Sequence, residues 1–161
     1  MLMEWLAAIQ ELPFAAALRS GRWSYAAVNA SHIVGIALLF GAIVPLDLRL
    51  TGLWRSIPIR TLARVLVPVA AAGLVLAMVA GLLMFSIRAV QYAGTTVFQI
   101  KLVLILCGVA NALLLRRALE WEAAQDAVGV APPLRLRLAG CSSIALWLAV
   151  IACGRAIAFV D

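Results

Sequence analysis

Apolar residues fall into four long blocks along the chain, rather than alternating with polar ones. The blocks cover about residues 25–46, 62–87, 97–115 and 138–160. Each has roughly the 20 residues that a helix needs to cross the hydrocarbon core of a bilayer. Because backbone polar groups in lipid must be bonded internally, each block is expected to be helical. The pattern predicts an all-α, polytopic membrane protein, an up-down-up-down bundle of four transmembrane helices.

A shorter segment, residues 3–20, precedes the first block. It mixes charged residues with Trp5 and Phe14 and is interrupted at Pro13. We expect this segment to lie along the membrane interface as an amphipathic element. Together with the four helices it would form a single membrane domain over residues 1–161.

Composition supports a membrane protein. Of the 161 residues, 66% are hydrophobic and only 12% are charged, whereas soluble domains are about half apolar. The lipid bilayer is therefore the first partner that the sequence predicts. The net charge of +6 belongs to no basic patch interleaved with aromatic residues, so we expect no nucleic-acid binding.

Basic residues are distributed unevenly between the two ends of the predicted bundle. One end carries eight of them: Arg49, Arg55, Arg60, Arg64, Arg116, Arg117, Arg135 and Arg137. The other end carries five: Arg19, Arg22, Arg88, Lys101 and Arg155. Cytoplasmic loops are enriched in Lys and Arg, so both termini are predicted to lie outside.

Two features are expected to fix the loops of the predicted bundle. Asp47 ends the first block and Arg64 opens the second, so a salt bridge between them would pin the first hairpin. Trp23, Trp54 and Trp121 fall near the predicted interfaces, where tryptophan is enriched as an anchor.

Polar residues inside the blocks need an explanation, because unpaired polar groups in lipid are costly. His32, the only histidine, lies in the first block. Counting 1.5 Å per residue places it roughly 12 Å below the outer end of its helix. By the same count Met78 and Cys107 lie at a similar depth in the second and third helices, so the three side chains could share one layer.

This arrangement suits a b-type haem. An imidazole nitrogen can ligate haem iron, and a thioether is a known second ligand. Arg and Lys near the interface can bind the propionates through charge-assisted hydrogen bonds. The candidate cofactor site comprises His32 as the iron ligand, Met78 or Met84 as the second ligand, Lys101 and Arg155 at the propionates, and Asn111 on the stripe of Lys101.

Two other interpretations remain open. The first has no cofactor: His32 hydrogen-bonds a neighbour such as Asn111 or a backbone carbonyl, and the methionines pack against apolar neighbours. The second is copper, because His32, Met78, Cys107 and Cys153 are ligands that Cu(I) accepts. No CxxC or MxxM spacing accompanies these copper candidates.

Four stretches carry a resemblance to known proteins: SHIVGIALLFGAIVPLDLRLTGLWR, ARVLVPVAAAGLVLAMVAGLLMF, FQIKLVLILCGVANALLLRR and GRAIAFV. They resemble an uncharacterised bacterial family of small four-helix inner-membrane proteins. The shared features are a histidine in the first helix, DLRL at its end, FxxK opening the third helix and GRxIA closing the fourth. The resemblance implies a multi-pass protein of the bacterial inner membrane and assigns no activity.

A more distant likeness is to the HemJ-type protoporphyrinogen oxidases and the CopD-type copper-resistance membrane proteins. HemJ-type proteins have a histidine in an apolar first helix and a lysine in a K-L-x-L context, which His32 and Lys101-Leu102-Val103-Leu104 match. The likeness implies that His32 binds haem. Ala112 stands where the HemJ type has a further histidine, so the oxidase activity is not implied.

The leading functional hypothesis is a haem protein that moves electrons between an outer-side donor and quinone or a partner subunit. The alternative is a non-catalytic accessory subunit of a larger membrane complex, or a homo-oligomer. Copper handling or small-solute transport is the third hypothesis. The sequence contains no Ser-His-Asp grouping and no glycine-rich phosphate loop, so it does not assign the chain to an enzyme class.

Overall fold

The computed structural model describes residues 1–160, without the side chains of Leu2, Ala158 and Val160. The described chain is all-α. Its helices are α1 (Leu2–Gln10), α2 (Pro13–Ser20), α3 (Arg22–Thr51), α4 (Ile59–Ile87), α5 (Ala89–Gly94), α6 (Thr96–Arg116), α7 (Leu119–Ala124) and α8 (Leu134–Val160). Four of them, α3, α4, α6 and α8, are long and apolar enough to cross a membrane. The predicted fold class is therefore confirmed.

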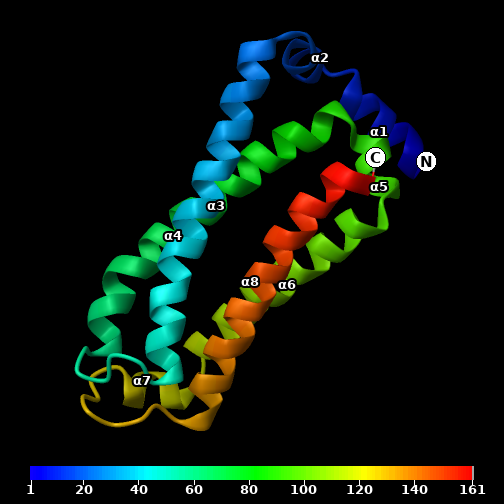
Figure 1. Cartoon of the computed structure of the whole chain (residues 1–161). Helices are drawn as coiled ribbons and strands as arrows, with labels where there is room; N and C mark the ends of the chain where they lie inside the picture. The colour runs from blue at the N-terminus through cyan, green and yellow to red at the C-terminus, as the bar shows by residue number, and fades with distance from the viewer. Residues whose placement is uncertain (161) are drawn as a thin grey trace.

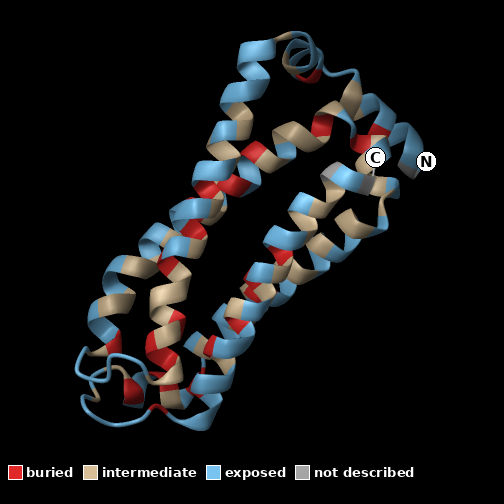
Figure 2. Ribbon diagram, in the orientation of Figure 1, coloured by how far each residue is buried: buried red, intermediate tan, exposed pale blue. Residues whose placement is uncertain are grey.

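The four long helices form an elongated bundle whose two ends differ (Figure 1). The chain termini lie at one end with α1, α2 and α5, while α7 and the longer loops lie at the other. We call the two halves of the bundle the terminal half and the loop half. Exposed residues cover the outer faces of the long helices (Figure 2). Many are large and apolar, such as Val75, Leu106 and Leu114, as expected for faces in contact with lipid.

Helix α3 is the centre of the packing. It packs along α4 and along α8, and α6 packs along α8, whereas α4 and α6 make at most marginal contact with each other. Three sides of the bundle are thus closed by helix contacts and the side between α4 and α6 is not.

Glycines allow the backbones of α3 and α4 to come very close. A Cβ atom added to Gly35 would lie 2.5 Å from the backbone nitrogen of Ala77, and one added to Gly73 would lie 2.5 Å from that of Leu39. Small residues permit this kind of approach between membrane helices. The small-residue face of α4 is therefore used inside the chain, against α3.

The loop half contains its own apolar core. Leu50, Ile59, Ala118, Trp121, Ala124 and Leu136 form a buried cluster that joins α7 to the ends of the long helices. Trp121 is only 8% exposed, so its predicted role as an interface anchor is wrong. The indole is buried because α7, which carries Trp121, packs against the ends of the long helices. The sequence around Trp121 does not predict this contact.

Arg49 ties the loops to the bundle. Its Nε donates to the carbonyl oxygen of Ile57 at 2.6 Å and its Nη2 to that of Ala127 at 3.2 Å. The side chain is fully buried, and α3 extends beyond the predicted block to Thr51, which carries Arg49 into the loop half. A residue counted as an exposed loop charge is therefore a buried structural one.

At the terminal end, residues 3–20 fall in two short helices, α1 and α2, which are separated just before Pro13 as the sequence predicts. Pro13 begins α2, as its fixed φ and missing N–H favour. Helix α1 packs on α5, and α2 packs on α3 and α4. Trp5 and Phe14 remain exposed, and their predicted place at a membrane interface stays a prediction.

Candidate functional site

His32 lies between α3 and α4 in the terminal half. Its Nδ1 is 2.8 Å from the carbonyl oxygen of Ala77, and since a carbonyl only accepts, Nδ1 carries the proton. In the neutral ring Nε2 then keeps its lone pair, and no residue of the described chain hydrogen-bonds to it. Gly81 lies against the ring, because a Cβ added there would be 3.1 Å from Cε1.

Lys101 faces the same region from α6. Its side chain is partly buried against α8, where a Cβ added to Gly154 would lie 3.3 Å from Nζ. The ammonium is near enough to His32 for the two groups to interact electrostatically. His32 and Lys101 thus lie on different helices within electrostatic range of each other. That they share one cofactor site stays a prediction.

The other predicted members of the haem site are more scattered. Met78 follows Ala77 along α4, at the level of His32, and is 43% exposed. Arg155 is exposed, with its guanidinium 4.8 Å from the centre of the Phe159 ring. Asn111 lies in the loop half, where its Nδ2 donates to the carbonyl oxygen of Ala139 at 3.0 Å. Asn111 therefore joins α6 to α8 and lies away from His32.

Three of the four candidate copper ligands, His32, Cys107 and Cys153, do not form a metal-binding group. Within the described residues, no three His, Cys, Asp or Glu side chains form a group that could hold a metal ion. Cys107 and Cys141 are exposed and Cys153 is partly buried, all as free thiols.

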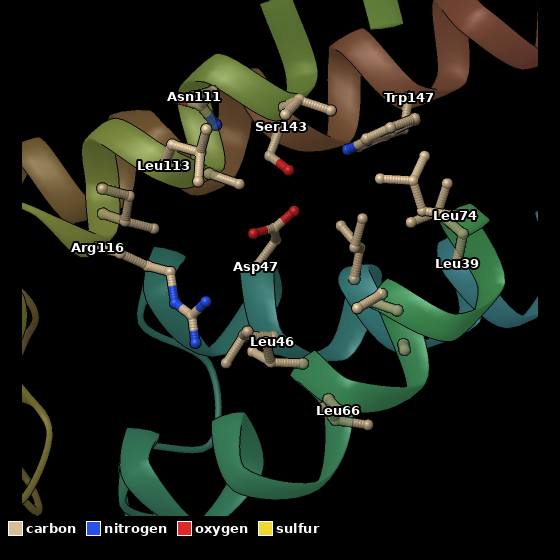
Figure 3. Close-up of a pocket in the computed structure, with 18 of the residues that line it drawn as sticks. Leu39, Leu46, Asp47, Leu66, Leu74, Asn111, Leu113, Arg116, Ser143 and Trp147 are labelled. Carbon is tan, nitrogen blue, oxygen red and sulfur yellow. The ribbon is translucent and has the colours of Figure 1, made fainter. Parts of the chain in front are cut away.

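A second region, which the sequence did not single out as a site, lies in the loop half. It is a cavity of about 250 Å³ between α3, α4, α6 and α8. Its walls are mostly aliphatic, with the indoles of Trp121 and Trp147 among them. Figure 3 shows the carboxyl group of Asp47 pointing into this space, opposite Ser143 and near Trp147.

Asp47 is 5% exposed, and its Oδ2 is buried with no hydrogen-bond partner in the described part of the chain. The predicted salt bridge to Arg64 is wrong, because Asp47 forms no ion pair within the described residues. Since α3 continues past Asp47, the side chain faces the bundle interior. Arg64 instead lines a separate polar cavity of about 200 Å³ with Arg60 and Arg116.

The close approach of α3 and α8 holds Asp47 in place. A Cβ added to Gly140 of α8 would lie 2.8 Å from the carbonyl oxygen of Asp47. The hydroxyl of Ser143, one turn further along α8, faces the carboxyl group. One sequence signal points to this site: in DLRL two charged residues stand two positions apart, so in a continuing helix they point in different directions.

These features define the class as a multi-pass membrane protein with four candidate transmembrane helices. The chain belongs to a family of unknown function, DUF6644, whose model matches residues 10–160. The resemblance to an uncharacterised family of four-helix membrane proteins is confirmed at this level. No curated protein and no solved structure matches the chain.

Proposed function

We propose that this protein is a membrane haem protein that carries electrons between a donor at its terminal half and quinone or a partner subunit. The observation that carries the proposal is the hydrogen bond from His32 Nδ1 to the Ala77 carbonyl oxygen. Histidines that bind metals commonly donate their second ring nitrogen to a backbone carbonyl, which sets the tautomer and the ring orientation.

The neighbours of His32 support the same role. Gly81 places no side chain beside the imidazole. Lys101 supplies a partly buried cation on the facing helix, and a buried ammonium is stabilised by a carboxylate such as a propionate. A bound haem would supply one-electron chemistry at its iron. The chain would orient the imidazole through Ala77 and bind the anionic edge through Lys101.

The distant likeness to HemJ-type proteins agrees with this choice of residues, because His32 and Lys101 carry it. In keeping with the resemblance to the uncharacterised four-helix family, we propose that the protein lies in the bacterial inner membrane. We further propose that its terminal half faces outward. The excess of arginine at the loop end agrees with that orientation.

The test is a reduced-minus-oxidised visible spectrum of detergent-purified protein produced with ample haem. Wild type should show the sharp α-band of b-type haem, and His32→Ala should lose it. Ser31→Ala is the matched control, because the Ser31 hydroxyl is exposed and, among the described residues, donates to the Ala27 carbonyl of its own helix alone. Ser31→Ala should keep the band.

Two results would contradict the proposal. A flat wild-type spectrum would remove haem altogether. A band that survives in His32→Ala would place the haem on another residue. A colourless protein that co-purifies with stoichiometric partners would instead indicate an accessory subunit.

A further inference from the structure

The cavity in the loop half opens toward the lipid. Its lining includes residues of α4 and of α6, two helices that make at most marginal contact. Ala112 and Leu113 of α6 line it and are themselves exposed. Along α3 the lining runs from Leu39 to Leu50, a distance of about 16 Å at 1.5 Å per residue. A lipid-soluble molecule can therefore enter from the side.

Inside this apolar space the polar groups are few and close together. Asp47 contributes a buried carboxyl oxygen with no partner. Ser143 contributes a hydroxyl, and the indole nitrogen of Trp147 points toward the same space (Figure 3). A buried polar atom without a hydrogen bond is costly, and such atoms are few in native proteins. The arrangement suits a ligand that brings a hydrogen-bonding group to Asp47.

The chemistry of these groups restricts the ligand. A carboxyl group accepts a hydrogen bond when ionised and donates one when protonated, and a hydroxyl does both. A quinone presents carbonyl oxygens and its reduced quinol presents hydroxyls, so Asp47 and Ser143 can bind either form. The flat ring suits walls that contain two indoles and aliphatic side chains.

Size and access agree with that ligand. A cavity of about 250 Å³ exceeds the roughly 150 Å³ that accommodates a benzene ring in an engineered protein core. A single quinone ring would fit within this volume, and its isoprenoid tail would leave between α4 and α6, the two helices with marginal contact. Arg116 also lines the cavity, and a neutral ring avoids the repulsion that this guanidinium would exert on a cation.

We propose that the cavity around Asp47 binds the ring of a membrane quinone, with Asp47 and Ser143 bonding its oxygen substituent. The role of this quinone as electron acceptor rests on the proposed haem function. Its binding rests on the cavity alone.

The experiment measures binding of a decyl-substituted benzoquinone to the detergent-solubilised full chain by quenching of tryptophan fluorescence. Wild type should bind saturably. Asp47→Leu should raise Kd by about tenfold or more, the effect of losing one good hydrogen bond. Asp126→Leu is the matched control, because Asp126 is exposed and lies outside the cavity, and its Kd should equal that of wild type.

A second pair of variants tests access. Ala112→Phe places a ring at the opening between α4 and α6 and should weaken binding. Ala110→Phe adds the same ring to an exposed position of α6 that does not line the cavity, and it should bind as wild type does. This pair also keeps the test decisive if Asp47→Leu does not fold.

Binding is also measured in His32→Ala. If His32→Ala lacks the haem band but still binds the quinone, quinone binding at the cavity does not depend on haem. The two proposals can then fail independently. The site proposal is overturned by non-saturable binding or by an unchanged Kd in both Asp47→Leu and Ala112→Phe. Equal affinity for decylbenzene would make the cavity an acyl-chain site, and tighter Asp47-dependent binding of decylammonium would make it an amine site. Either result would also overturn the proposal.

Discussion

His32 and Asp47 stand on the same helix, α3, but their surroundings are opposite. Fifteen positions separate them, about 22 Å along the helix axis. His32 has a hydrogen bond at 2.8 Å from Nδ1 to the adjacent helix, whereas Asp47 has a buried oxygen with no partner and faces a cavity. In the terminal half the polar group is oriented by the protein. In the loop half the Ser143 hydroxyl faces the carboxyl group, and one carboxyl oxygen, Oδ2, has no partner among the described residues.

The lack of an ion pair at Asp47 within the described chain is unexpected from the sequence, because a residue of opposite charge lies very near along the chain. Arg49 is only two positions away and is also buried, with Nη1 unpaired. Residues at i and i+2 of a helix do not face each other. Arg49 therefore reaches the loop carbonyls of Ile57 and Ala127, while Asp47 points to α8. Helix geometry keeps the two charges apart.

The largest effect is expected where α3 meets α4, next to the histidine. Gly35→Leu should lower the stability of the bundle by about 1–3 kcal/mol or more, because a side chain there collides with the backbone of α4. Gly41→Leu is the matched control on the same helix, since a Cβ added to Gly41 meets no atom within 4 Å. Thermal unfolding in detergent measures both. Equal losses would show that the close α3–α4 contact is not needed.

Changes of intermediate size in unfolding free energy are expected at Asp47 and His32. The change should have opposite signs at the two residues. Asp47→Leu should stabilise the protein by about 1–3 kcal/mol, because it removes a buried group with an unsatisfied oxygen. His32→Leu should destabilise the haem-free protein by about 1 kcal/mol, the usual net value of one hydrogen bond. Denaturant or thermal unfolding gives both values. A loss of stability in Asp47→Leu would mean that the carboxyl group is already satisfied.

The smallest effect is expected at the exposed ion pair between Arg60, at the start of α4, and Asp126. Arg60 bonds both carboxylate oxygens of Asp126, at 2.7 and 2.8 Å. These hydrogen bonds, together with the charge of Arg60, hold the pKa of Asp126 below its ordinary value. A carboxylate with a lowered pKa stabilises the fold above its unfolded-state pKa, and this contribution is lost as pH falls through the folded-state value.

Asp126→Asn should therefore lower stability slightly at neutral pH and leave it unchanged in strong acid. Unfolding temperatures of wild type and variant, measured from neutral pH down to about pH 2, should converge at the acid end. A constant difference across that range would show that the carboxylate charge does not contribute. Asp47 is the contrast, because none of the ion pairs among the described residues includes it.

The amino-acid pattern was sufficient for the fold class. Long apolar blocks specify spanning helices because lipid offers no partner for backbone groups, and this constraint is local to each block. The same pattern also indicated His32 and Lys101 as candidate functional residues. An isolated polar residue within an apolar block can be recognised from the sequence, however the helices pack.

Tertiary structure alone decided which polar groups are satisfied. Whether Asp47 meets Arg64 or a cavity depends on where α3 ends and on how closely Gly140 lets α8 approach. Tertiary packing also decides that Trp121 is buried, because α7 packs against the ends of the long helices. It likewise places the Ala77 carbonyl where it orients His32. The length of an apolar block predicts whether a spanning helix forms, which is a local property. A hydrogen bond or a cavity depends on the distance between helices, which only packing determines.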